Sequence, residues 1–191
     1  MKSKLFSIFI ALFVFLFGMT ACSKSATQGT MVNAVASTTI VGDVVKQIGG
    51  DRIQLTVLFP VGADPHTFEP RPQDAAAIAD ADILFLNGLE LEHSLEPVIE
   101  SNASGKVVEV SDGVDVLAFT ESHHDEDGEE GHDHAAGDPH TWTDPNMVMV
   151  WVENIKTELS AIDPENAAYY ETNAENYLTQ LTDLDAWIRE E

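Results

Sequence analysis

Two identical tetrapeptides carry the side chains best suited to chemistry in this sequence. DPHT occurs at residues 64–67 and again at residues 138–141. A neutral imidazole is a common zinc ligand, and the proline before each histidine stiffens the loop that presents it. The aspartate of each copy is suited to cap the turn or to orient the imidazole. The repeat therefore predicts that His66 and His140 bind one metal ion, against the competing interpretation that Asp-Pro is merely a frequent turn dipeptide.

The segment directly before the second DPHT is rich in acidic residues and histidines. Residues 121–137 read ESHHDEDGEEGHDHAAG, and their only aliphatic side chains belong to alanines. This composition cannot contribute to a core, so it predicts a mobile loop. Clustered imidazoles suit zinc, copper or nickel, and we interpret them as auxiliary metal-capturing residues; a solvated charge run is the competing interpretation. These histidines are His123, His124, His132 and His134, whereas His93 lies in a helical stretch and is predicted to be structural.

The N-terminus has the pattern of an export signal. Lys2 and Lys4 precede an apolar run that is shorter than the ~20 residues of a membrane helix. The run ends in MTAC, which contains Cys22, the single cysteine of the chain. Bacterial lipoproteins carry lipid on a cysteine in this position, so we predict a signal peptide at 1–21 and a lipidated tether at 22–30. An ordinary signal peptide with an incidental cysteine is the alternative interpretation.

The charge of the chain restricts its partners. The sequence has 33 acidic and 9 basic residues, a formal net charge of −24. Such a surface repels nucleic acid and attracts cations, although acidity also keeps an exported protein soluble. We therefore exclude nucleic acid as a partner. The export signal and Cys22, and not the charge, lead us to expect a membrane-anchored lipoprotein on the outer face of a bacterial membrane, in the periplasm or at the cell surface.

Alternating strands and helices must position the two histidines. Short apolar runs predict strands at residues 31–37, 52–59, 82–88 and 106–110. Helical patterns with caps fall between them, at residues 38–50, 72–81 and 89–101. This alternation predicts an α/β fold with a parallel sheet flanked by helices. Ligands of such sheets bind beyond the carboxyl ends of the strands, where His66 follows the second strand and His140 the fourth.

Two helices are predicted after the second DPHT. Asp144 and Pro145 open the first, and Asp163 and Pro164 open a longer one that runs to residue 191. Apolar residues recur every three or four positions along this second helix, at Ala167, Tyr170, Ala174, Tyr177, Leu181, Leu184 and Ile188. The sequence shows no stop signal there, so we expect the chain to be a fragment that ends inside the helix.

Three stretches give the chain a family resemblance. ASTTIVGDVVKQIGGDRI, LFPVGADPHTFEPRPQDAAAIADADILFLNGLELE and DPHTWTDP stand in that order before the long helix. From the lipidation box to its last residue, the chain resembles the N-terminal part of zinc/manganese ABC-importer solute-binding lipoproteins. The resemblance implies two α/β lobes joined by one long helix, with the metal between them.

The same resemblance implies roles for the parts of this chain. Residues 31–162 match the N-terminal metal-binding lobe, whose two ligands match His66 and His140, and residues 163–191 match the start of the linking helix. The remaining ligands, a histidine or glutamate and an aspartate, come from a C-terminal lobe that we expect to be absent here. The His-rich loop favours zinc over manganese as the ion that a monomeric receptor delivers to a membrane permease.

Two other functions remain open from the residues. A metal buffer or adhesin would depend on the His-rich loop alone. A zinc hydrolase would need an open coordination position and a general base, for which Glu69 is a candidate three residues after His66. The sequence contains no His-Glu-x-x-His motif, so we predict that the chain is not an enzyme.

Overall fold

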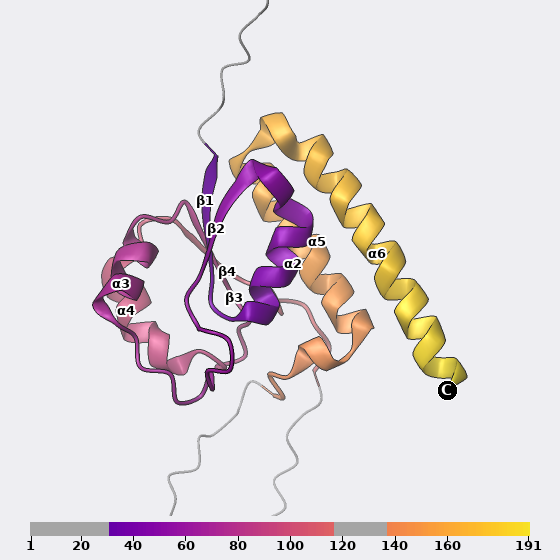
Figure 1. The fold of residues 1–191 in the computed structure, drawn as a ribbon, viewed down its shortest axis with the longest axis horizontal. Coiled ribbons are helices and arrows are strands. Elements are labelled where there is room, and N and C mark those ends of the chain that lie inside the picture. The colour runs from indigo at the N-terminus through magenta and orange to yellow at the C-terminus, as the bar shows by residue number, and fades with distance from the viewer. Residues whose placement is uncertain (1–30, 117–136) are drawn as a thin grey trace, which may run out of the picture. The chain divides into compact units, whose positions relative to one another are not determined.

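The computed structural model of the chain describes residues 31–116 and 137–191 (Figure 1). The predicted signal peptide, Cys22, the tether and the four loop histidines lie outside the described residues, so their assigned roles stay predictions. Within the part of the chain that the structure describes, no helix has both the length and the apolar character that a membrane crossing requires.

A four-stranded sheet organises the described residues, and its strand order is β2-β1-β3-β4. All three strand pairs are parallel, with Val35 of β1 opposite Thr56 of β2 and Leu84 of β3. The central strands are mostly buried and apolar, as expected for a parallel sheet covered on both faces; Asn33 of β1 is the exception. This confirms the predicted α/β fold. The strands are β1 (Val32–Ala36), β2 (Ile53–Val57), β3 (Ile83–Leu86) and β4 (Lys106–Glu109).

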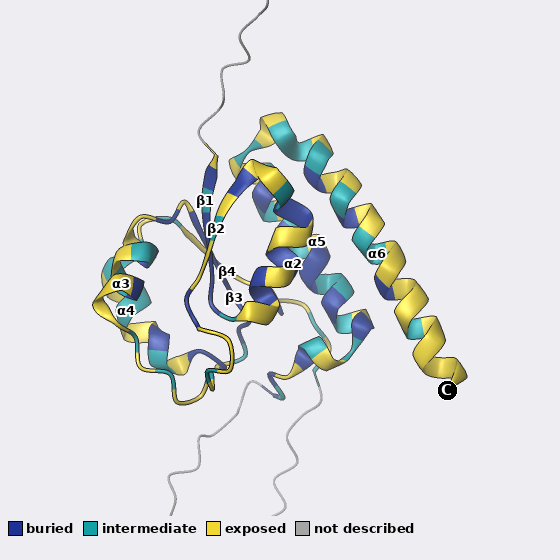
Figure 2. Cartoon of the chain, viewed as in Figure 1, coloured by how far each residue is buried: buried dark blue, intermediate teal, exposed yellow. Residues whose placement is uncertain are grey.

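Two helices cover one face of the sheet and a third packs against the outer side of these two; together the three hold most of the core (Figures 1 and 2). Their largest fully buried side chains include Trp151 and Tyr170. The Thr38 hydroxyl caps the first of them by accepting a hydrogen bond from the Val41 N–H at 3.1 Å, as the sequence predicts. These helices are α2 (Thr39–Gly49), α5 (Pro145–Ile162) and α6 (Ala167–Glu190).

The opposite face is covered by two shorter helices, α3 (Pro72–Ala79) and α4 (Glu96–Asn102) (Figure 1). Here Val35, Leu84 and Ile78 form a second apolar cluster with Phe59 and Leu95. Helices on both faces leave the two ends of the sheet as the places where loops gather. The carboxyl ends of the strands therefore become the natural place for a site.

The prediction of one helix over residues 89–101 is wrong at its start. Leu89 and Glu90 have φ values of 56° and 62°, in the left-handed region that a helix does not use. A single 3-10 turn (His93–Leu95) then leads into α4. This reversal brings Glu92 back onto the end of β3, where its carboxylate binds backbone amides.

The long C-terminal helix forms as predicted, with a 3-10 turn (Pro164–Asn166) before α6. The Asp163 carboxylate accepts hydrogen bonds from Asn166 and Tyr170, both at 2.7 Å. The predicted apolar stripe is buried at Tyr170, Ala174 and Leu181. Near the end of α6 the members Leu184 and Ile188 of this stripe are exposed, as is the neighbouring Trp187.

Candidate metal site

The two DPHT loops meet beyond the carboxyl ends of the strands. The ring centroids of His66 and His140 lie 5.8 Å apart, and their planes are inclined by 54°. Two imidazoles that share a tetrahedral zinc at ~2.0–2.1 Å have ring centroids roughly 5 Å apart. The observed separation is therefore close to that of two imidazoles bound to one ion.

Within residues 31–116 and 137–191, no group of three or more histidine, cysteine, aspartate or glutamate side chains is arranged to hold a metal ion. His66 and His140 are thus a pair of neighbouring histidines, and no third such side chain in the described residues completes a site around them. Both histidines are exposed, and the side chain of His140 is 47% accessible to solvent. The pair is thus open to an ion and to further ligands from outside these residues.

Each DPHT copy folds into the same local turn. The Asp64 carboxylate accepts a hydrogen bond from the His66 N–H at 3.0 Å, and the Asp138 carboxylate accepts one from the His140 N–H at 2.9 Å. An aspartate that binds the backbone two residues later forms an Asx turn. The repeated sequence therefore produces a repeated structure that presents its histidine in the same way.

Asp138 has a second role at the His140 ring. Its Oδ1 atom lies 2.7 Å from His140 Nδ1. A carboxylate in this position accepts the Nδ1–H and leaves Nε2 free as the metal-binding nitrogen. Trp142 packs against the same imidazole edge-on, with ring centroids 5.1 Å apart. The orientation of His140 is therefore set from two sides.

Replacing Asp138 with alanine is expected to weaken zinc binding about 10-fold, because the imidazole loses its orienting acceptor and the turn loses its cap. Affinity would be measured by competition with a chromogenic chelator. Asp183→Ala, which removes the same charge from an exposed position on α6, serves as the control. Equal affinities of the two variants would contradict an orienting role for Asp138.

Sequence reasoning missed the buried polar residues that support these loops. Glu92 is only 4% exposed, and its carboxylate accepts hydrogen bonds from the Ser37 hydroxyl at 2.5 Å and from the N–H groups of Asn87 and Gly88 at 2.7 and 3.2 Å. Burial raises the pKa of Glu92 above its usual range, although the three hydrogen bonds oppose this shift. The available signal was a polar residue directly after each central strand, at Ser37 and Asn87.

Two hydrogen bonds, one to Pro139 and one to Thr141, join the second DPHT loop to residues that follow β3 and β4. The side-chain amide of Asn87 donates to the Pro139 carbonyl at 3.0 Å and to the Gly88 carbonyl at 2.9 Å. The hydroxyls of Ser111 and Thr141 are 3.1 Å apart. The loop that carries His140 is therefore anchored on the scaffold at residues on either side of the histidine.

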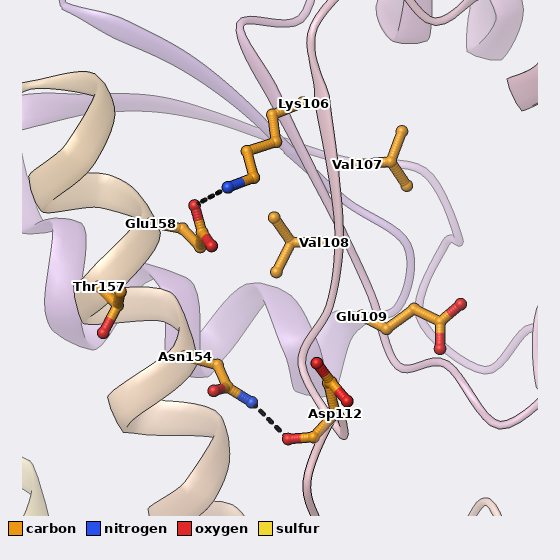
Figure 3. Close-up of a pocket in the computed structure, with 8 residues that line it drawn as sticks. All are labelled: Lys106, Val107, Val108, Glu109, Asp112, Asn154, Thr157 and Glu158. Carbon is orange, nitrogen blue, oxygen red and sulfur yellow. Dashed lines mark hydrogen bonds and ion pairs between the residues drawn. The ribbon is translucent and has the colours of Figure 1, made fainter.

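A groove of about 390 Å³, with neither histidine among its lining residues, lies between β4 and α5 (Figure 3). Lys106 and Glu158 form an ion pair across it, and the Asn154 side-chain amide donates to the carbonyls of Val110 and Asp112 at 2.9 Å. These contacts join the sheet edge to the helix. We assign the groove a structural role.

A sequence-family model described as zinc-uptake complex component A, periplasmic, matches residues 34–191. Manganese-binding lipoprotein MntA of Halalkalibacterium halodurans is 40% identical over 164 residues, which cover 86% of this chain and 51% of the relative. The manganese ABC transporter substrate-binding lipoprotein PsaA of Streptococcus anginosus is 35% identical and is covered over 59% of its length. The chain thus spans about half the length of these relatives.

Solved structures show the same similarity. An Mn-bound periplasmic metal binding protein from Candidatus Liberibacter asiaticus superposes with a TM-score of 0.67 at 29% identity, over 78% of this chain and 52% of that one. A Cd-bound form of that protein matches equally well. Zn(II)-bound AdcA from Streptococcus pneumoniae gives a TM-score of 0.69 at 26% identity, over 82% of this chain and 32% of AdcA.

Proposed function

Because this chain belongs to the family described as zinc-uptake complex component A, periplasmic, we propose that it is a metal-receiving lobe of a receptor that delivers zinc to an ABC importer. The family consists of solute-binding receptors and not of enzymes, in agreement with the prediction that the chain is not an enzyme. The observation that carries the proposal is the His66–His140 pair, whose ring centroids lie 5.8 Å apart beyond the carboxyl ends of the strands.

The choice of zinc rests on the donor atoms. Two imidazoles favour zinc, whereas manganese prefers oxygen donors. Relatives are named for manganese, and similar structures are described with manganese, cadmium or zinc, all of them metal ions. We also propose that the four histidines of residues 121–137, which directly precede the second DPHT in the sequence, capture metal ions as auxiliary ligands.

The proposal also covers the parts of the chain around the pair. Residues 31–162 form the metal-binding lobe, and residues 163–191 begin a helix that links it to a second lobe in the longer relatives. The ligands beyond His66 and His140 come from outside the described residues. Lipid on Cys22 holds the receptor at the outer face of the membrane as a monomer, close to its permease.

A chelator-competition titration with zinc and with manganese, with and without residues 121–137, tests this function. We expect one-to-one binding that survives the deletion and favours zinc, since imidazole sites follow the order in which zinc binds more tightly than manganese. Loss of all binding with the loop would instead favour the metal-buffer alternative.

A further inference from the structure

We infer that Glu92 and Asn87 form a buried clamp that positions His140 for the metal ion, an inference that rests on the proposed function of the histidine pair. Neither residue touches the imidazole. Both act through the backbone of the second DPHT loop, and we refer to them as the Glu92–Asn87 clamp.

The clamp is built where the two central strands end. Ser37 follows β1 and Asn87 follows β3, and neither has any exposed surface. The left-handed residues Leu89 and Glu90 reverse the chain so that Glu92 returns to this point. Its carboxylate then accepts the Ser37 hydroxyl and two consecutive peptide N–H groups, which fixes Asn87 relative to both strands.

Asn87 transmits this fixed position to the peptide unit before His140. Its side-chain amide lies between the carbonyls of Gly88 and Pro139, so its NH₂ group must face both of them. The Pro139 carbonyl belongs to the same planar peptide unit as the His140 N–H. That N–H is held by the Asp138 carboxylate, so both polar ends of the unit are fixed.

Stability alone gives a weak reason for a buried carboxylate at this point. A packed apolar residue of similar volume often stabilises a fold as well as a buried charged group does. Burial also raises the pKa of Glu92, which reflects the unfavourable desolvation of its charge. The contribution of the carboxylate is instead geometric. It holds three donors in fixed positions, namely the Ser37 hydroxyl and the N–H groups of Asn87 and Gly88.

The experiment compares zinc affinity and thermal stability in Glu92→Gln and Asn87→Ala. We expect about 10-fold weaker binding in each, as found when residues that orient metal ligands are replaced. Asn33→Ala is the matched control, because the Asn33 amide binds the Asp80 carbonyl at 2.7 Å near the amino end of β1. This control should lower the melting temperature and leave the affinity within about twofold, since it lies at the other end of the strand.

Repeating both clamp variants in a His140→Ala background separates positioning from general destabilisation. If the clamp acts through His140, its variants should change the remaining affinity by less than about twofold in that background. An equal loss in both backgrounds would overturn the inference. If His140→Ala itself has no effect, the proposed function fails instead.

If the clamp variants do not fold, a milder variant can still test whether the clamp positions His140. Ser37→Ala removes one of the three hydrogen bonds to Glu92 and leaves the amide of Asn87 in place. We expect it to fold and to bind zinc about threefold more weakly, since only part of the support is lost. A folded Ser37→Ala protein with unchanged affinity would overturn the inference.

Discussion

Replacing His140 with alanine is expected to lower the zinc affinity of the chain on the order of 100-fold. Structural zinc sites with four ligands bind with ~10–16 kcal/mol, so that one ligand contributes about 3 kcal/mol, which corresponds to roughly two decades in affinity. His66→Ala should have a similar effect, because the proposed site takes one imidazole from each loop and the two ring centroids are 5.8 Å apart. Chelator competition at neutral pH measures both.

His93→Ala provides the control for this experiment. His93 is the remaining described histidine; its side chain is 70% exposed and pairs with Glu96 at the start of α4. Its removal should leave the affinity unchanged. If all three variants bind zinc equally well, the ion is held elsewhere, and the paired DPHT histidines are not its ligands.

Trp151→Ala is expected to reduce the free energy of unfolding by about 3–5 kcal/mol. Trp151 is fully buried on α5, within the core cluster beneath the sheet, and its removal leaves a large cavity. A domain of this kind is stable by only ~5–15 kcal/mol, so the variant would lose a large part of its stability. Urea denaturation followed by circular dichroism measures the free energies of unfolding of the variant and of the unsubstituted protein.

Trp187→Ala is the matched control for stability. Trp187 is 58% exposed near the end of α6, so its replacement should change the free energy of unfolding by no more than about 0.5 kcal/mol. Trp151→Phe, which keeps most of the buried volume, should fall between the two alanine variants. A loss at Trp187 as large as that at Trp151 would mean that the end of α6 contributes to stability more than its exposure indicates.

Local patterns predict most of the fold. Apolar runs identify the four strands, and capping residues such as Thr38 and Asp144 identify where helices begin. The membership of the chain in the metal-receptor family confirms the resemblance seen in its motifs. The DPHT repeat predicts a histidine pair, and the structure brings the two rings together.

The support of that pair could not be predicted in the same way. The hydrogen bonds from Ser37 to Glu92 and from Asn87 to Pro139 join residues 55 and 52 positions apart, and no local pattern encodes them. The helical composition of residues 89–101 also conceals the reversal at Leu89 and Glu90, because these residue types rarely adopt a positive φ. Cys22, the His-rich segment and the second lobe remain predictions.

The strand order has a consequence for how the site comes into being. His66 follows β2 at one edge of the sheet, whereas the anchors of His140 follow β3 and β4 on the other side of β1. Neither half of the sheet can assemble the pair alone, and contacts between residues so distant in sequence form slowly during folding. A partly folded chain would lack the pair entirely. Binding of one ion by both histidines would therefore require all four strands to be in place.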